Sequence, residues 1–415
     1  MKSYVDALAS TCATVEPLRA ESRDLARVCG TTTAADVASR LDVPAFANAA
    51  MDGFALRATD TSGAGADNPV QLEVTGITAA GDRPGAAPPP AGAVEIMTGA
   101  PMPAECDAVV PIECVTTDSD AAGRILRVRI AESLEPGRNV RTAGEDFRRG
   151  DRVLARGRRI EPHDVMALAA TGSDRIDCHA APRIAVITTG SELAEYGAPD
   201  DPGMIRNSNG PYLESIIGHI GAVLTERVNA ADRPEDLDAA IASARNSADV
   251  ILTTGGVSAG RYDLIPDAVE RAGGTVMFHK VAIRPGKPLL FARLADGTLM
   301  FGLPGNPIAA AVGLRFFVVP ALRRLQGLQP ERYHAAVSED RIHKRAALRF
   351  FGKAYAEVDT DGRLRVHLLH GQESFRIQPL TESNCWVIVP EGPEIVSSGD
   401  LVRVAPLYPT GFLQN

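Results

Sequence analysis

The chain has 415 residues, which is long for a single hydrophobic core and predicts roughly two to four domains. Its hydrophobic content of 45% and charged content of 23% are typical of a globular protein, and its net charge of −9 argues against a general nucleic-acid-binding protein. The 6 cysteines form no CxxC pair, which argues against a zinc site and favours reduced thiols in a cytoplasmic protein. There is no signal-peptide pattern and no apolar run of membrane-spanning length, so we expect no membrane partner.

The first 180 residues predict helices on either side of a β-rich block. Near the amino terminus apolar residues recur at helical spacing, and this pattern predicts a helix over residues 1–27. Residues 28–140 consist of short β-type segments broken by Gly and Pro, which indicates a small, mostly β domain. Residues 141–180 return to a mixed pattern, with a helix expected over residues 163–170.

From residue 183 onward, apolar β-type segments alternate with amphipathic helical ones. Strands are expected over residues 184–188, 223–228, 250–253, 289–294 and 300–303, and helices over residues 212–221, 234–246, 265–272 and 308–325. This alternation predicts a doubly wound α/β sheet with right-handed crossovers. Beyond about residue 330, short alternating segments such as 386–389 and 401–404 predict a terminal β-barrel or sandwich.

The strand expected over residues 250–253 is followed by a turn that is rich in glycine. This turn contains Gly255, Gly256 and Gly260, with Ser258 between them. Glycines at the carboxyl end of a parallel strand let backbone N–H groups approach an anion closely, and open α/β sheets bind their ligands at this edge. A plain strand-to-helix turn accounts for a Gly-Gly pair about equally well, so the prediction of an anion site depends on the neighbouring loops.

Those neighbouring loops carry carboxylates and small polar residues. The loop after the first strand has three groups that can donate to a phosphate, at Thr189, Gly190 and Ser191. Glu192 in the same loop, Asp232 after the second strand and Asp263 after the third supply oxygen ligands of the kind that Mg²⁺ prefers. Each carboxylate alone is more typical of a helix cap. The three together favour a divalent cation bound with phosphates.

Two further turns are suited to an anion. Lys280, Arg284 and Lys287 surround a Pro-Gly turn, where an arginine can hold an oxyanion bidentately and a lysine acts as a point charge. A solvated charge run is the alternative, although apolar residues bracket these charges. The second turn leads into a helix and comprises Pro304, Gly305 and Asn306.

The amino-terminal half contributes polar residues in or beside glycine-containing turns. The candidates are Asp52, Thr98 and Asp146. Each of these turns is by itself more typical of a structural turn than of a site. None of them identifies a function from its residues alone.

Taken together and in order, these motifs resemble those of the molybdopterin molybdenumtransferase (molybdenum insertase) family, which includes bacterial MoeA and the carboxyl-terminal domain of gephyrin. The matching segments are residues 51–55 (MDGFA), 97–101 (MTGAP), 144–146 (GED), 189–193 (TGSEL), 207–210 (NSNG), 254–258 (TGGVS), 284–288 (RPGKP) and 303–307 (LPGNP). The match covers about residues 1–325 and is looser beyond them, at Asn384 and residues 389–392. Any one motif is common, whereas the ordered set is specific.

The resemblance implies an elongated homodimer in which each chain has four domains. The expected divisions are a split helical linker domain of residues 1–27 and 141–180, an inserted mostly β domain of residues 28–140, an α/β molybdopterin-binding domain of residues 181–328 and a β-barrel of residues 329–415. The active site would lie between the α/β domain of one subunit and the inserted domain of the other. The implied reaction inserts molybdenum from molybdate into adenylylated molybdopterin and releases AMP.

The same resemblance implies roles for the candidate residues. The catalytic residues would be Asp52, Thr98, Asp146, Glu192 and Asp263. The substrate-binding residues would be Thr189, Gly190, Ser191, Gly255, Gly256, Ser258, Lys280, Arg284, Lys287, Pro304, Gly305 and Asn306. Mg²⁺ would be held by Glu192, Asp232 and Asp263, and would neutralise the phosphate link under attack.

Two places depart from the family pattern. Arg284 stands where the family usually has Lys, which keeps the charge and changes its geometry. Gln378 and Pro379 stand where serines are common, a departure compatible with a paralogue that handles tungstate. Two other functions are open: a molybdopterin adenylyltransferase, whose activity resembles a single α/β domain, and a non-catalytic scaffold of the gephyrin type. Handover from an adenylyltransferase and to molybdoenzymes is a further expectation from the resemblance.

Overall fold

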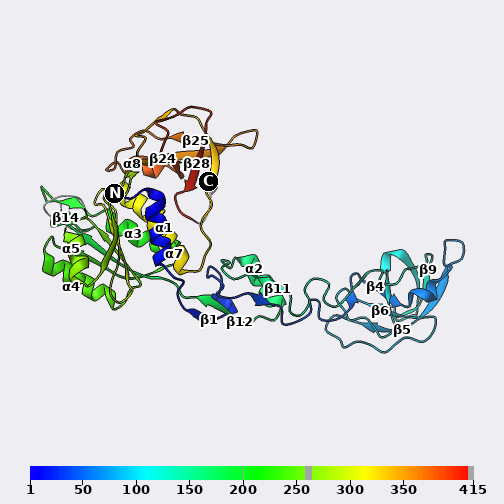
Figure 1. Ribbon diagram of the computed structural model, residues 1–415. Coiled ribbons are helices and arrows are strands. Elements are labelled where there is room, and N and C mark those ends of the chain that lie inside the picture. Colours follow the sequence, from blue (N-terminus) through cyan, green and yellow to red (C-terminus); the bar gives the residue numbers. More distant parts are fainter. Residues whose placement is uncertain (200, 258–263, 410–415) are drawn as a thin grey trace.

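The computed structural model describes residues 1–199, 201–257 and 264–409. The chain is elongated, with an α/β unit and a β-barrel together at one end and a slender linker in the middle (Figure 1). A β-rich unit of residues 44–146, the distal domain, lies at the other end. This confirms the expected fold class. Every helix formed by the described residues is too short or too polar to cross a lipid bilayer.

The α/β unit is built on a six-stranded sheet with the order β16–β13–β17–β21–β20–β18. Its strands are β13 (Arg183–Thr189), β16 (Val223–Ala230), β17 (Val250–Thr254), β18 (Thr275–His279), β20 (Leu290–Arg293) and β21 (Leu299–Leu303). β16, β13, β17 and β21 run parallel as predicted, and β20 runs antiparallel to β21. β18 is antiparallel to β20 and therefore runs in the direction of the parallel strands. β18 is an addition to the expected strands, and its half-buried position at the sheet edge explains its weak apolar pattern.

Helices cover both faces of this sheet. α4 (Pro234–Arg245) and α5 (Leu264–Arg271) pack on one face, and α3 (Asn209–His219) packs on the other together with a long carboxyl-terminal helix. The long helix comprises α6 (Pro307–Gly313), a π-helical segment η4 (Leu314–Val318) and α7 (Val319–Leu325). Its residues are buried almost throughout, which explains an apolar sequence without a polar face.

The amino-terminal helix is shorter than the sequence predicts. α1 spans Tyr4–Thr14, so the helix expected over residues 1–27 is wrong beyond that point. Pro17 has no N–H to donate and disfavours a helical conformation of the residue before it. The chain continues instead as β1 (Ala20–Asp24), which pairs antiparallel with β12 (Arg175–His179). α1 itself shares the core of α3 and α7, so it packs on the α/β unit.

Short strand pairs and a helix form the linker. Its further elements are η1 (Leu25–Arg27), β2 (Val37–Ala38), β11 (Arg152–Leu154) and α2 (Pro162–Ala170), and β2 pairs antiparallel with β11. The predicted helix over residues 163–170 is confirmed as α2. A carboxylate oxygen of the nearly buried Asp164 accepts the Glu161 N–H at 2.9 Å, and the other accepts Arg158 Nη2 at 2.6 Å. These bonds satisfy the first turn of α2.

The distal domain contains a six-stranded sheet with the order β7–β4–β6–β5–β9–β8. Its elements are β4 (Gly53–Leu56), η2 (Ala58–Thr61), β5 (Val70–Thr78), β6 (Gly92–Ile96), β7 (Ala108–Pro111), η3 (Ile112–Cys114), β8 (Val115–Ser119) and β9 (Ile125–Ile130). The chain enters and leaves this domain side by side. β3 (Asn48–Ala49) pairs with β10 (Val140–Arg141), and the Val43 N–H donates to the Phe147 carbonyl at 2.7 Å.

The carboxyl-terminal domain is a closed five-stranded barrel. Its strands are β22 (His334–Ser338), β24 (Arg349–Val358), β25 (Leu364–Leu368), β26 (Cys385–Val389) and β28 (Leu401–Pro406), with β23 (Ile342–His343), β27 (Ile395–Val396) and α8 (Gln378–Glu382) at its ends. The barrel closes because β24 pairs with both β25 and β26. β19 (Ile283–Arg284) from the α/β unit runs parallel beside β24. The expected terminal barrel is thereby confirmed.

The barrel and the α/β unit share a buried junction. Arg315 on η4 is 1% exposed, and its guanidinium donates to both carboxylate oxygens of Glu331 at 2.8 and 2.6 Å. Its Nε donates to the Pro406 carbonyl of the barrel at 3.0 Å. Beside it, Phe316 stacks on Phe351 with ring centroids 4.0 Å apart. The two units therefore pack as one body.

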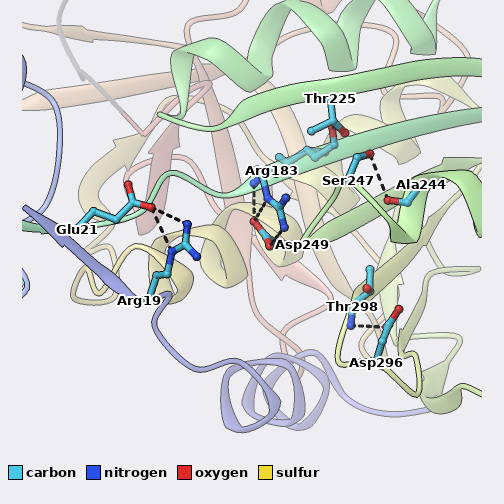
Figure 2. A network of polar contacts seen from close by, with 10 residues as sticks. Arg19, Glu21, Arg183, Thr225, Ala244, Ser247, Asp249, Asp296 and Thr298 are labelled. Atoms are coloured by element: carbon cyan, nitrogen blue, oxygen red, sulfur yellow. Dashed lines mark hydrogen bonds and ion pairs between the residues drawn. The ribbon is translucent and has the colours of Figure 1, made fainter.

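The amino edge of the α/β sheet is held by polar contacts (Figure 2). Asp249 accepts the Arg183 N–H and Arg183 Nη2, both at 2.9 Å, and so joins the starts of β17 and β13. Asp296 accepts the Thr298 N–H at 3.0 Å in the turn before β21. These contacts hold the starts of the strands together at this edge.

Candidate active site

A cavity of about 1020 Å³ lies at the carboxyl edge of the α/β sheet. The turns after β13, β17 and β21 line it, and the turn after β16 contributes Asp232. The predicted site residues among its lining are Thr189, Gly190, Glu192, Asp232, Gly255, Gly256, Pro304, Gly305 and Asn306. Parallel strands end together at this edge, which explains why residues far apart in the sequence meet there.

Glycine is required where these turns approach one another. Gly255 has φ +91°, and a Cβ there would lie 2.5 Å from both the carbonyl oxygen and Oγ1 of Thr189. The Gly255 N–H donates to the Leu303 carbonyl at 3.2 Å, and Thr189 Oγ1 donates to the Thr254 carbonyl at 3.2 Å. The three turns therefore pack closely, and their backbones form the floor of the cavity.

Two carboxylates lie on adjacent turns of the cavity. Asp232 accepts the Ser191 N–H at 3.1 Å, and its own N–H donates to Ser191 Oγ at 3.4 Å. The Glu192 carboxylate folds over Gly190, where a Cβ would lie 2.9 and 3.0 Å from its two oxygens. Among the residues that the structure describes, no three His, Cys, Asp or Glu side chains are grouped to hold a metal ion.

Two predicted residues, Ser258 and Asp263, lie outside the described residues. The three predicted cations are on the segment that leads to the cavity. Pro288 lines the cavity directly after Lys287, while Lys287 and Arg284 are exposed on the surface beside it and Lys280 is half-buried.

The distal domain holds the remaining candidates. Asp52 Oδ1 accepts both the Thr98 N–H at 2.6 Å and the Thr98 hydroxyl at 2.8 Å. The backbone and then the side-chain hydrogen bond from Thr98 hold the pKa of Asp52 below its usual value. Asp146 is exposed, and its N–H donates to the Val43 carbonyl at 2.9 Å. Within one chain the linker separates the distal domain from the α/β sheet (Figure 1).

Sequence reasoning missed two groups of cavity residues. The first is the pair Asn207 and Asn209, which precede and begin α3. Asn207 Nδ2 donates to Thr188 Oγ1 at 3.0 Å, and Asn209 Nδ2 donates to the Gly305 carbonyl at 2.8 Å. They bind the turns to one another, and the NSNG motif was the available signal.

The second missed group is Phe375 and Ile377 of the barrel domain, which line the same cavity. The Ser374 carbonyl accepts the N–H of Ile308 on α6 at 3.0 Å, so the barrel reaches the carboxyl edge of the sheet. No sequence pattern predicts this contact, because it depends on how the barrel packs against the α/β unit.

Family models match nearly the whole chain in three parts. The MoeA N-terminal region (domain I and II) matches residues 2–172, the probable molybdopterin binding domain matches residues 185–324, and the MoeA C-terminal region (domain IV) matches residues 335–407. The molybdopterin molybdenumtransferase of Synechococcus elongatus is 35% identical over 396 residues, with 94% of this chain and 95% of that protein covered. The chain belongs to the MoeA family.

Further relatives agree with this membership and confirm the resemblance found in the sequence. The molybdopterin molybdenumtransferase of Bacillus subtilis is 34% identical over 373 residues, with 89% of this chain and 86% of that protein covered. The crystal structure of the molybdopterin biosynthesis MoeA protein from Pyrococcus horikoshii OT3 matches with a TM-score of 0.83 at 26% identity, covering 98% of this chain and 100% of that one. The MoeA arrangement of domains is therefore the fold of this chain.

Proposed function

We propose that this MoeA-family chain is a molybdopterin molybdenumtransferase that inserts molybdenum from molybdate into adenylylated molybdopterin and releases AMP. The observation that carries this function is the cavity whose floor is built from the glycine turns after β13, β17 and β21. Family membership supplies the reaction class, and the turns supply a backbone surface that a phosphate can approach. The protein works in the cytoplasm and receives its substrate from a molybdopterin adenylyltransferase.

The chain's own residues would bind and orient the phosphate link. Gly190 and Gly255 would let its oxygens approach the backbone closely, and Thr189 lines the same floor. The cations of residues 280–287 would reach it from the segment that leads to the cavity. Thr98 donates to Asp52 twice, which favours the ionised carboxylate and suits a group that orients water or a cation. It acts from the distal domain of the second subunit in a homodimer.

Mg²⁺ fits the donor set at the cavity. Glu192 and Asp232 line it from adjacent turns and provide the hard oxygen ligands that this ion takes, with Asp263 as the third candidate. When bound, the ion would neutralise charge on the phosphate link. We also propose the division into linker (1–27 and 141–180), inserted, α/β and barrel domains, with two exceptions: α1 packs on the α/β unit, and β2 pairs within the linker.

Single-turnover release of AMP from adenylylated molybdopterin, measured with Mg²⁺ and with or without molybdate, tests the function. We expect release that depends on molybdate and yields active cofactor. Release with tungstate alone would keep the chemistry and change the metal. Tight pterin binding without release would contradict the proposal and favour a scaffold.

Complementation tests the shared active site. Asp52→Asn and Asp232→Asn should each inactivate the homodimer. Co-expressed together, they should restore about a quarter of wild-type activity, because half of the dimers are mixed and each mixed dimer has one intact site. Absence of any recovery in purified mixed dimers would contradict a site shared between subunits.

A further inference from the structure

Large apolar side chains are exposed around the polar floor of the cavity. Phe375 is 63% exposed, Ile377 is 42% exposed and Ile205 of β15 (Ile205–Arg206), which pairs with β14 (Leu193–Ala194), is 61% exposed. All three line the cavity. Apolar side chains exposed together around a concave site indicate a surface that a ligand covers.

The barrel loop that carries Phe375 and Ile377 is fixed in place from below. Lys353 on β24 is 0% exposed, and its ammonium donates to the Arg376 carbonyl at 2.9 Å and to the Glu373 carbonyl at 3.3 Å. Burial of an ammonium group is costly unless its hydrogen bonds are satisfied. Folding thus requires the loop to stay over Lys353, because the loop carbonyls are what satisfy this charge.

Two further contacts fix the same loop. The Gln372 side chain accepts the Lys353 N–H at 2.9 Å, and its amide donates to the carbonyls of Lys353 at 2.9 Å and Leu369 at 2.6 Å. At the cavity end, the Ser374 carbonyl accepts the Ile308 N–H at 3.0 Å. The exposed Phe375 ring is therefore presented from a loop that is held on both sides.

We propose that Phe375 and Ile377 form the wall of the cavity against which a planar heteroaromatic ring of the substrate stacks, and that Lys353 is the residue that positions this wall. The inference rests on the proposed function, whose substrate carries a pterin and an adenine. With phosphate oxygens on the glycine floor, a ring attached to them reaches the rim where the apolar side chains lie. An aromatic face with a β-branched neighbour suits the flat face of such a ring.

Steady-state kinetics with adenylylated molybdopterin test the wall. Stacking of a ring on an aromatic side chain is strong enough that Phe375→Ala should raise KM about tenfold, and by more than it lowers kcat, while Phe375→Trp should restore KM. Tyr355→Ala is the matched control, since Tyr355 is a 42% exposed aromatic on β24 that is absent from the described lining of the cavity. Equal KM values for the two alanine variants would overturn the proposal.

The positioning role of Lys353 has its own control. Lys344 is a second buried lysine, 8% exposed, whose ammonium also donates to two backbone carbonyls, those of Arg345 at 3.1 Å and Leu348 at 2.9 Å. Lys353→Met should raise KM by at least as much as Phe375→Ala, whereas Lys344→Met should leave KM unchanged. If both methionine variants raise KM equally, Lys353 has only a structural role.

Equilibrium binding identifies the ring and separates this inference from the reaction. Wild type and Phe375→Ala are titrated with AMP and, separately, with pterin-6-carboxylic acid. Weaker binding of AMP alone assigns the wall to the adenine, and weaker binding of the pterin alone assigns it to the pterin. Unchanged binding of both overturns the wall even if the enzyme turns over. If the wild-type protein binds a ring through Phe375 but releases no AMP, the proposed function is contradicted and the stacking wall is not.

Discussion

The buried ion pair at the junction of the barrel and the α/β unit gives a sharp stability prediction. Glu331→Gln removes the carboxylate that faces Arg315. Arg315 is 1% exposed, and its guanidinium also donates to the Pro406 carbonyl at 3.0 Å. Leaving a buried charge unpaired costs about 3–5 kcal/mol. Because the Gln oxygen still accepts one hydrogen bond, we expect a loss of about 3 kcal/mol in the free energy of unfolding.

Urea unfolding followed by tryptophan fluorescence measures this loss. The chain has a single tryptophan, Trp386, whose ring lies 6.3 Å from that of Phe316, the residue next to Arg315, so its emission reports on this junction. Glu21→Gln is the control: Glu21 pairs at 3.1 Å with Arg19, which is 83% exposed, and its loss should cost at most about 1 kcal/mol (Figure 2). If Glu331→Gln destabilises the protein no more than the control, the pair does not stabilise the junction.

Three other substitutions test local features. Thr98→Val should raise the pKa of Asp52 toward its usual value in an NMR titration. A lowered carboxylate pKa stabilises the folded state above the usual pKa, and this effect is lost as the pH falls through the folded value. The distal domain of the variant should therefore be less stable than wild type at neutral pH, and the difference should vanish in acid. An unchanged titration would refute this. Gly255→Ala should reduce single-turnover AMP release at least about 100-fold, since its Cβ would lie 2.5 Å from Thr189, and near-normal release would show that the turns can separate. Asp164→Asn should lower the thermal stability of the linker by about 1–3 kcal/mol, measured by calorimetry, and no change would mean that α2 begins without this cap.

The regular elements could be predicted from the sequence because their signals are local. The parallel strands of the α/β sheet have continuous apolar runs, and α2 (Pro162–Ala170) begins within one residue of the predicted start. The failures are also local in origin. The helical periodicity near the amino terminus wrongly extended the predicted helix past Pro17. β18 was missed because this edge strand is only half-buried, so its sequence lacks a continuous apolar run.

The site could be predicted only in part. The turn residues could be placed together because the carboxyl ends of parallel strands lie at the same edge of a sheet, a rule that needs only the predicted strands. Contacts between domains have no such rule. Phe375 reaches the cavity because Lys353 and Ile308 hold its loop. Nothing in the sequence shows that Lys353 is buried or which carbonyls its ammonium contacts. Likewise, spacing alone could not show that Thr98 donates to Asp52, which lies 46 positions earlier in the chain.

The side-by-side entry and exit of the distal domain bear on how such a chain could have been assembled. At the base of this domain the Val43 N–H lies 2.7 Å from the Phe147 carbonyl, so a gap between these two positions could be closed by a very short turn. The neighbouring pair of linker strands, β2 and β11, lies outside residues 44–146 and does not depend on them. Residues 44–146 could therefore have been inserted as one domain into an ancestral chain, without a rearrangement of the linker on either side.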